Sequence, residues 1–409
     1  MQILFIHQNL PAQFKHLIAH YARTPGVEVF GLGEAVRVKS NFSRAIDGFR
    51  LFAYSFSEEA KPATYHALRQ TGAALRRGFA VAKALQGLRE RGIRPDVIYG
   101  HPGWGEMLYV RDIFPNARIV NFCEFYFNRQ GQDFGFDPEF GEVDPNGWHI
   151  RTENMTHAVS LLAADRGISP TEWQRSRYPI ELREKIDVVH DGVDTHVIRP
   201  DPNAKVMLRG KGLTLTSHDE VITFVNRNLE PYRGFHVFMR ALPEILRRRP
   251  NAHVVIVGGD EVSYGRALKG TTWRARLLAE VGKELDAARV HFVGRVKYRD
   301  YLRVLQVSTA HVYLTYPFVL SWSMLEAMAV GCVVVGSRTS PVEEVIRDGE
   351  NGWLVDFFDR AQLVDAVVNV CERRESMGPI RAAARATVMQ RFDLRTVCLP
   401  RQVGMLGME

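Results

Sequence analysis

The sequence predicts an α/β protein with two facing open domains, each built on a parallel sheet. The chain has 409 residues, which is too many for one ordinary hydrophobic core. Short runs rich in β-branched residues alternate with helical patterns in both halves. Arg-Pro-Asp-Pro at residues 199–202 marks a linker between the halves. Because ligands bind beyond the carboxyl ends of strands in such sheets, we expect the active site in the cleft between the domains.

The first half contains both strand and helix patterns and one long loop. Strands are expected at residues 3–6, 27–32, 97–100, 118–122 and 159–163, and helices at 13–21, 62–91 and 106–113. Residues 128–147 lack periodicity, and so long a loop in a compact domain tends to be functional or mobile. A last strand within residues 186–194 leads to the linker.

The second half repeats the alternation. Strands are expected at residues 221–225, 253–257, 290–293, 311–314 and 332–336, and helices at 234–248, 272–285, 298–307, 321–330, 341–347 and 360–374. We therefore expect one domain at residues 1–200 and another at 201–388. The final segment, 389–409, is expected to cross back to the first domain.

The composition is that of a globular protein with a basic surface. Hydrophobic residues make up 46% of the chain, and the formal net charge is +7. Part of the positive charge lies on the predicted helix at residues 62–91 and its exit, at Arg69, Arg76, Arg77, Lys83, Arg89, Arg91 and Arg94. We interpret this helix as packed on the core with a solvated basic face, and weak peripheral membrane contact is the alternative. No basic run with interleaved aromatics indicates a nucleic-acid partner.

Targeting and redox features predict a cytoplasmic protein. Residues 1–7 lack the basic leader of a secretory signal, and no apolar run approaches the roughly 20 residues that span a bilayer. The cysteines are widely spaced and form no CxxC motif or Cys/His cluster: Cys123, Cys332, Cys371 and Cys398. We therefore expect reduced thiols and no structural zinc site.

Residues 311–336 have the pattern of a nucleotide-diphosphate cradle. A short apolar strand leads into a loop, a helix begins near Ser321, and a buried strand restarts after Gly331. Backbone N–H groups at a helix N-terminus bind phosphate, and the carboxylate of Glu326 can accept hydrogen bonds from ribose hydroxyls. Ser321 can also simply cap the helix, and both roles can coexist.

Four segments, in order along nearly the whole chain, carry a family resemblance. They are residues 190–200 (HDGVDTHVIRP), 225–234 (VNRNLEPYRG), 323–331 (SMLEAMAVG) and 341–352 (PVEEVIRDGENG). The chain resembles the retaining nucleotide-sugar glycosyltransferases of the GT-B fold, in the bacterial group 1 family. The resemblance implies two Rossmann-like domains, the first on the acceptor side and the second binding the nucleotide-sugar donor.

The resemblance implies donor-binding roles in the second half. Arg227 and Arg233 match the cations that hold the donor's diphosphate and stabilise the charge on the leaving group, although such a pair can also simply flank a turn. The further donor-binding candidates are Gly258, Gly259, Arg295, Val296, Lys297, Phe318, Ser321, Trp322, Ser323, Met324, Leu325 and Glu326. The Gly-Gly pair is equally expected in a plain turn.

Phe318 departs from the family pattern. It occupies the place of a glutamate that normally helps to hold the donor sugar's hydroxyls, and Val319 and Ser321 stand at the two following glycine positions. The replacement leaves the identity of the sugar open. It also keeps open a non-catalytic sugar-nucleotide-binding role.

Candidates for acceptor binding and catalysis in the first half follow predicted strands. The acceptor-binding candidates are Asn9, Gln13, Tyr126 and Arg129, of which the first two can equally form a capped loop-to-helix junction. His101, in a His-Pro-Gly turn, is either catalytic or structural. Glu124 either stabilises oxocarbenium-like charge or is a structural carboxylate paired with Arg129 or Arg151.

We predict transfer of a hexosyl-type group from a nucleotide diphosphate sugar to a glycan, lipid-linked or small-molecule acceptor, with retention. The resemblance implies that the departing diphosphate takes the acceptor's proton. No cofactor or metal is expected, because two arginines neutralise the diphosphate. A nucleotide-sugar epimerase or hydrolase on the same fold is the main alternative. Arg233 is expected to be exposed to the cleft, so Arg233→Ala should abolish turnover and leave the fold intact.

Overall fold

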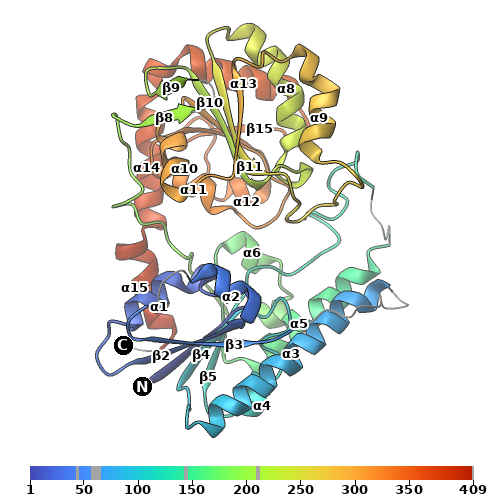
Figure 1. Ribbon diagram of the computed structural model, residues 1–409, viewed down its shortest axis with the longest axis vertical. Coiled ribbons are helices and arrows are strands. Elements are labelled where there is room, and N and C mark those ends of the chain that lie inside the picture. The colour runs from blue at the N-terminus through green and yellow to red at the C-terminus, as the bar shows by residue number, and fades with distance from the viewer. Residues whose placement is uncertain (43–45, 57–65, 142–145, 209–211, 408–409) are drawn as a thin grey trace. The chain divides into compact units, whose positions relative to one another are not determined.

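The computed structural model divides the chain into two units, each with its own parallel sheet (Figure 1). It describes residues 1–42, 46–56, 66–141, 146–208 and 212–407. One unit comprises Met1–Gly192 with Arg395–Glu409, and the other comprises Val193–Leu394. The predicted fold class, α/β with two parallel-sheet domains, is confirmed. The acceptor and donor roles assigned to residues 1–200 and 201–388 stay predictions.

The first unit contains a seven-stranded sheet in the order β3-β2-β1-β4-β5-β6-β7. The strands are β1 (Gln2–Ile6), β2 (Glu28–Glu34), β3 (Phe49–Tyr54), β4 (Val97–Gly100), β5 (Arg118–Phe122), β6 (Arg166–Ser169) and β7 (Ile186–Val188). The strand order reverses between β1 and β4, which pair in parallel with Ile6 opposite Gly100. Ligands commonly bind at such a switch point, beyond the carboxyl ends of the strands.

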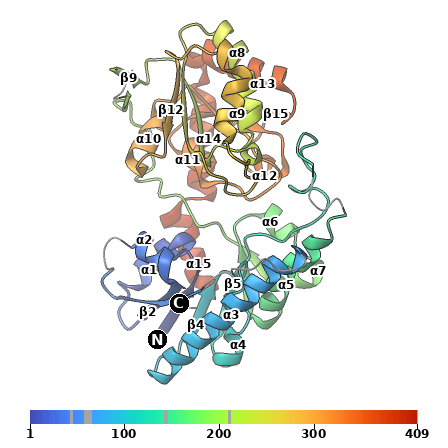
Figure 2. The same ribbon diagram turned by 45° about the vertical axis from the view of Figure 1, so that its right-hand side comes forward.

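Helices cover both faces of this sheet (Figures 1 and 2). One face is buried by α3 (His66–Glu90), α4 (Val110–Ile113), α5 (Trp148–Ala163) and α7 (Ile180–Arg183). The other is buried by α1 (Lys15–Tyr21), α2 (Ala35–Asn41) and the C-terminal α15 (Leu399–Met405). Two short helices, η1 (Ala12–Phe14) and α6 (Glu172–Ser176), follow β1 and β6. The end of the chain therefore completes the core of the first unit.

The second unit contains a six-stranded parallel sheet in the order β12-β11-β10-β13-β14-β15. The strands are β10 (Val221–Asn228), β11 (His253–Gly259), β12 (Val290–Gly294), β13 (Ala310–Tyr313), β14 (Val333–Ser337) and β15 (Trp353–Val355). A separate antiparallel hairpin, β8 (Lys205–Leu208) and β9 (Leu213–Thr216), precedes the sheet. The strand order reverses between β10 and β13, so this sheet has its own switch point.

The helices of the second unit pack on its sheet in two layers. The layer around α10 (Tyr298–Gln306) and α11 (Trp322–Ala329) includes α12 (Ser340–Glu343) and α14 (Gly378–Arg391). The other layer contains α8 (Phe235–Arg248), α9 (Trp273–Val281) and α13 (Arg360–Glu372). In that layer, Phe238 of α8 stacks on Phe224 of β10, with ring centroids 4.6 Å apart.

Sequence periodicity predicted the helices and strands of the second half better than those of the first half. The strand predicted at residues 159–163 is wrong, since these residues form the end of α5. A short apolar run fits a strand and a buried helix equally well. Of the helix predicted at 106–113, only α4 (Val110–Ile113) forms. Within the helix predicted at 62–91, residues 62–65 lie outside the described part, as do 142–145 of the predicted loop. In the described ranges no helix is long and apolar enough to cross a membrane.

The turn after β4 depends on Gly105, and its replacement should destabilise the first unit. Gly105 has φ +102°, and a Cβ there would lie 2.1 Å from the carbonyl oxygen of Ala74 in α3. Gly92 also has positive φ (+84°), but a Cβ there would meet nothing within 4 Å. Gly92→Ala should cost about 1 kcal/mol of unfolding free energy through strain alone. Gly105→Ala should cost about 2 kcal/mol more, because α3 must move. Urea unfolding of both variants measures the difference, and equal losses would contradict the close approach.

Candidate functional site

The carboxyl end of β10 carries Arg227 on a β-bulge. Val225 pairs with Val257 and Asn228 with Gly259, so two residues of β10 face one residue of β11. A bulge of this kind re-aims a side chain and is common beside active sites. Arg227 is exposed there. We expected this arginine to follow the strand. Instead, β10 extends to Asn228, so Arg227 is the second-to-last residue of the strand.

Arg233 is buried, not exposed as the sequence predicted. Its Nη1 donates to Thr315 Oγ1 at 2.6 Å and to the carbonyl oxygen of Val319 at 3.1 Å. Nearby, the amide of Tyr316 donates to the carbonyl oxygen of Tyr232 at 3.0 Å. The guanidinium therefore ties the loop after β10 to the loop after β13 at the switch point. Sequence reasoning missed this because the partners are more than eighty positions away in the chain.

Phe318 belongs to an aromatic cluster around Arg233. Its ring lies 5.1 Å from that of Tyr232 and 5.0 Å from that of Tyr264, and the guanidinium of Arg233 lies over Tyr264 at 5.3 Å. Glu230, buried, fixes the loop that carries Tyr264. Its carboxylate accepts from the backbone N–H groups of residues 263 and 265 at 2.9 and 2.8 Å. Phe318 is thus a packing residue in a cluster that encloses the cation.

The start of α11 has the predicted cap and carboxylate. Ser321 Oγ accepts from the backbone N–H of Ser323, so the capping role is confirmed. Glu326 accepts hydrogen bonds from Tyr298 at 2.6 Å and from Tyr301 at 2.5 Å. Burial, followed by the Glu326 charge, raises the pKa of both phenols, so they remain donors at neutral pH. The sequence did not identify these tyrosines, which lie on α10.

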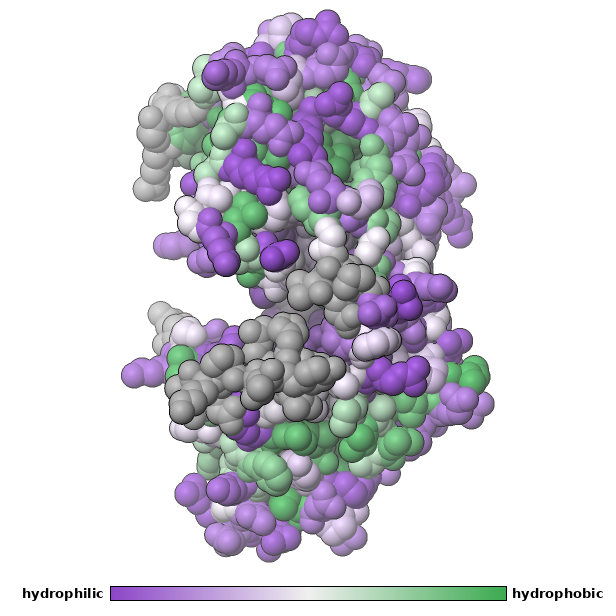
Figure 3. Space-filling view, turned by 90° about the vertical axis from the view of Figure 1, so that its right-hand side faces the viewer, coloured by the Kyte–Doolittle hydropathy of each residue, from purple (hydrophilic) through white to green (hydrophobic). Residues whose placement is uncertain are grey.

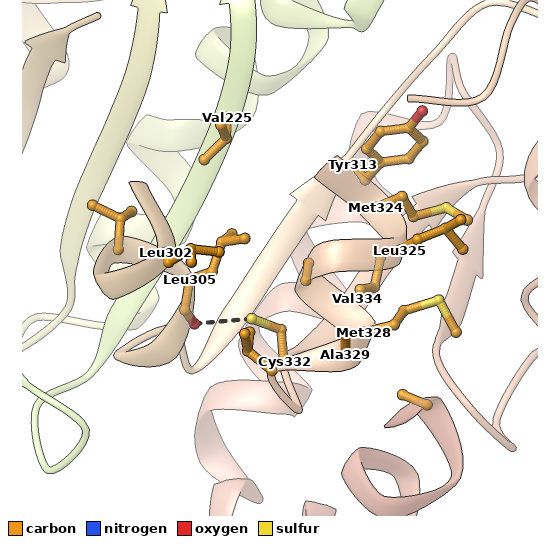
Figure 4. Packing of buried hydrophobic residues seen from close by; sticks show 14 of the residues in the cluster. Val225, Leu302, Leu305, Tyr313, Met324, Leu325, Met328, Ala329, Cys332 and Val334 are labelled. Carbon is orange, nitrogen blue, oxygen red and sulfur yellow. Dashed lines mark hydrogen bonds between the residues drawn. The ribbon is translucent and has the colours of Figure 1, made fainter. Parts of the chain in front are cut away.

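The buried face of α11 fixes the position of its N-terminus (Figure 4). Met324, Leu325 and Met328 are fully buried, and the Cys332 thiol donates a hydrogen bond to the carbonyl oxygen of Leu305, with Sγ 3.0 Å from the oxygen. At the other end, Arg385 Nη1 donates to the carbonyl oxygen of Ala329 at 2.5 Å. The side chains of Met324 and Leu325, predicted to bind donor, are therefore core residues. Their backbone remains a candidate.

The other predicted donor residues lie at the end of β11, after β12 or on α11. A Cβ at Gly258 would lie 2.7 Å from the Leu229 side chain, and one at Gly259 would lie 2.6 Å from Asn228 Oδ1, so close packing favours glycine at both positions. Arg295 donates to Asn228 Oδ1 at 2.8 Å and pairs with Glu261. Val296 is partly buried against the core. Lys297 and Trp322 are exposed.

In the first unit, the structure brings together three predicted residues: His101, Glu124 and Gln13. His101 Nε2 lies 3.2 Å from Glu124 Oε2, and Gln13 Nε2 donates to Glu124 Oε1 at 3.3 Å. The N–H of Gly103 donates to His101 Nδ1 at 3.0 Å, which assigns the imidazole proton to Nε2. The suggested pairing of Glu124 with Arg129 or Arg151 is wrong within the described residues. Burial alone would raise the pKa of Glu124, but its bonds to His101 and Gln13 lower it below the usual value.

Sequence reasoning missed His7, Trp104 and His157 in this cluster. The ring of His101 stacks on Trp104 at 4.4 Å and lies 5.3 Å from His7. The N–H of Asn9 donates to His7 Nδ1 at 2.8 Å, and burial holds the pKa of His7 well below its usual range. His7 follows β1 as His101 follows β4, and these strands are neighbours at the switch point. That shared position was the signal available in the sequence.

The remaining acceptor-binding candidates are a hydrogen-bonded loop residue, a packed tyrosine and an exposed arginine. Asn9 Oδ1 accepts from Arg37 at 3.0 Å, which supports the loop-to-helix alternative. Tyr126 packs on Tyr178, with ring centroids 5.0 Å apart. Arg129 is exposed. The described part of the chain contains no group of three or more His, Cys, Asp or Glu arranged to hold a metal ion.

Two family models and several curated proteins match the sequence. The model described as glycosyl transferase family 4 group matches residues 26–198, and that described as glycosyl transferases group 1 matches residues 211–387. Proteins named D-inositol 3-phosphate glycosyltransferase are 29% identical over 238 residues (Nocardioides sp.) and 31% identical over 235 residues (Acidothermus cellulolyticus). Each match covers 56% of this chain and 50% or 49% of the relative. The chain thus spans about half the length of the curated relatives it matches.

Solved structures are similar over the whole chain. Sucrose-phosphate synthase from Thermosynechococcus elongatus has a TM-score of 0.73 at 17% identity, covering 100% of this chain and 98% of that chain. The Anabaena protein HepE in complex with UDP-glucose has a TM-score of 0.65 at 18% identity, covering 100% of both chains. At these identities the likeness shows the fold alone, and it is the GT-B-like fold that the sequence predicted.

Burial of Arg233 changes the expected outcome of its removal. Arg233→Ala should lower the unfolding free energy by about 3 kcal/mol, because Thr315 and Val319 lose a buried charged donor. Arg227→Ala, at an exposed position, should change it by no more than about 0.5 kcal/mol. Chemical denaturation of the two variants tests the assignment. Equal stabilities would contradict the structural role given to Arg233.

The buried His157 should make the first unit acid-labile. Burial lowers the pKa of His157 to about 3 from the usual 6.5. The unfolded chain therefore binds more protons between these values, and stability falls as the pH drops through this window. Between about pH 7 and about pH 5, this histidine should account for about 2 kcal/mol of lost stability.

Urea unfolding at both pH values should show a correspondingly smaller pH-dependent loss in His157→Gln than in the wild type. The exposed His196 gives the matched control, since His196→Gln should keep the wild-type loss. The same pH dependence in His157→Gln as in the wild type would contradict the assignment.

Proposed function

The chain belongs to the group 1 family of glycosyltransferases, and we propose that it transfers a sugar from a nucleotide diphosphate sugar to an acceptor with retention of anomeric configuration. The carrying observation is the carboxyl edge of the second sheet. There the bulge of β10 presents an exposed cation, Arg227, and α11 begins with a capped N-terminus followed by the carboxylate of Glu326. A cation, a helix N-terminus and a carboxylate are the groups that a nucleotide diphosphate requires.

In this proposal the nucleotide is held by three kinds of contact. Arg227 pairs with the diphosphate. Its fixed positive charge stabilises the negative charge that builds up on the diphosphate as the glycosidic bond breaks. The N-terminus of α11 faces the phosphate oxygens, because the dipole of the helix favours negative charge at that end. Glu326 accepts the ribose hydroxyls. The hydroxyls of Tyr298 and Tyr301 each donate to one of its oxygens and hold the carboxylate in place.

Arg233 acts in this proposal chiefly by positioning. Its Nη1 is committed to Thr315 and to the backbone of Val319, so it sets the path of the loop between β13 and α11. That loop determines where the N-terminus of α11 stands. Removal of Arg233 would therefore affect donor binding and stability together, unlike removal of Arg227.

The chemical step proposed is a same-face substitution. The acceptor hydroxyl oxygen forms a bond to the anomeric carbon while the bond from that carbon to the donor phosphate breaks. The acceptor proton passes to the departing diphosphate, so no separate base is consumed. Glu124 of the first unit, kept anionic by His101 and Gln13, suits a site that stabilises positive charge on the sugar or accepts a substrate hydroxyl.

Nucleotide binding and turnover test the proposal in sequence. Thermal shift is measured against UDP, GDP, ADP and dTDP, with UDP first because HepE is described in complex with UDP-glucose. Ligand at about 100 times its dissociation constant should stabilise the protein by about 2.7 kcal/mol. Turnover of the selected nucleotide sugar with and without acceptors then separates the alternatives. Release of free nucleotide without an acceptor would favour an epimerase or hydrolase, and binding without turnover a binding protein.

Removal of Arg227 should weaken nucleotide binding without unfolding the protein. Arg227→Ala should raise the dissociation constant for the selected nucleoside diphosphate at least about tenfold, the value of one charge-assisted contact. Arg373, exposed at the end of α13, provides a matched control, because Arg373→Ala removes the same charge at the end of a helix outside the site. Titration calorimetry measures both, and unchanged affinity in Arg227→Ala would remove Arg227 from the site.

A further inference from the structure

Helix α5 has polar side chains on its buried side and apolar side chains on its exposed side. Its buried side carries polar residues, including Asn154, Thr156, His157 and Ser160. Its outer side carries Trp148, Met155, Val159 and Leu162, of which Trp148 is 72% and Leu162 is 64% exposed. A helix on a globular surface normally has the opposite arrangement.

The buried polar side of α5 has a structural function in the first unit. Asn154 Oδ1 accepts from the N–H of Phe127 at 2.9 Å, and its Nδ2 donates to the carbonyl oxygen of the same residue at 2.7 Å. These two hydrogen bonds fix the backbone of the segment that follows Glu124. The exposed apolar side has no such internal explanation.

Helix α3 extends the apolar side of α5. The two helices pack against each other, and Leu75 and Phe79 of α3 are exposed, with Phe79 stacked on Tyr109 at 5.0 Å. We call these six side chains the α3/α5 surface: Leu75, Phe79, Trp148, Met155, Val159 and Leu162. Figure 3 shows apolar surface gathered on the face where α3 and α5 lie. Contiguous apolar patches on a monomer usually mark an interaction site.

Cations continue the same helical stripes. Lys83 is one turn beyond Phe79 on α3, and Arg151 lies between Trp148 and Met155 on α5, and both are exposed. Further exposed cations follow at and beyond the end of α3, at Arg89, Arg91 and Arg94. Glu90 is the acid at the end of that stripe. An apolar face with a tryptophan and flanking cations has the chemistry of a surface that inserts between anionic headgroups.

We propose that the α3/α5 surface docks the first unit on an anionic lipid membrane. Trp148, Leu162 and their neighbours enter the headgroup boundary, and Lys83 and Arg151 pair with lipid phosphates. A second copy of the chain fits less well, because a two-fold contact would place the same cations of both copies together. The net charge of +7 also favours an anionic partner over a like-charged one. This inference does not depend on the proposed sugar transfer.

Vesicle co-sedimentation of the full chain tests the docking. Wild-type protein should bind vesicles of phosphatidylcholine with phosphatidylglycerol more tightly than vesicles of phosphatidylcholine alone. The double variant Phe79→Ser, Leu162→Ser should bind the anionic vesicles at least about tenfold more weakly, because two apolar side chains no longer insert. Lys83→Gln with Arg151→Gln should weaken binding and reduce its salt dependence.

Exposed apolar residues elsewhere provide the controls. Val36 on α2 and Met207 on β8 are 78% and 70% exposed, and Val36→Ser or Met207→Ser should leave vesicle binding unchanged. Thermal unfolding shows whether each variant is folded. Failure of the folded wild type to bind anionic vesicles, or equal binding by the Phe79/Leu162 double variant, would overturn the proposal. A concentration-dependent dimer that this variant abolishes, without vesicle binding, would assign the surface to a second copy instead.

Discussion

Both sheets are parallel throughout, and this constraint places the chemistry of the chain. Parallel strands bring all their carboxyl ends to one edge, so residues far apart in sequence meet where strands end. In the first unit, His7, His101 and Glu124 follow three adjacent strands, β1, β4 and β5. In the second, Arg227 lies at the end of β10 and Thr315 follows β13, and these strands are also neighbours. The reversal of strand order leaves room beside these residues, because the connecting helices leave in opposite directions.

Buried charges then convert the loops at these edges into fixed structures. Arg233 joins two loops through Thr315 and Val319, and Glu230 holds a third through backbone N–H groups. A buried charge is costly unless it is fully paired, so these contacts favour one loop arrangement strongly over others. The aromatic cluster containing Phe318 closes over the cation. Such preorganisation suits a site that must hold a diphosphate while charge moves within it.

Helix α5 links the interior of the first unit to its surface. Its polar side binds the backbone after Glu124, which requires Asn154 to face inward. The apolar residues are consequently turned outward, beside Leu75 and Phe79 of α3. One helix thus supports the candidate site on one side and presents the α3/α5 surface on the other.

The sequence by itself determined the alternation of strands and helices, the parallel α/β class, the Ser321 cap and the family resemblance. These follow from local periodicity, capping chemistry and motif order, which neighbouring residues encode. The burial of Arg233, the pairing of Glu124 with His101, and the tyrosines that hold Glu326 were decided only by tertiary structure. So was the helical state of residues 159–163, whose apolar run fits a strand equally well. Each depends on partners from distant segments, and local patterns record that a residue is apolar or charged but not which partner the fold brings to it.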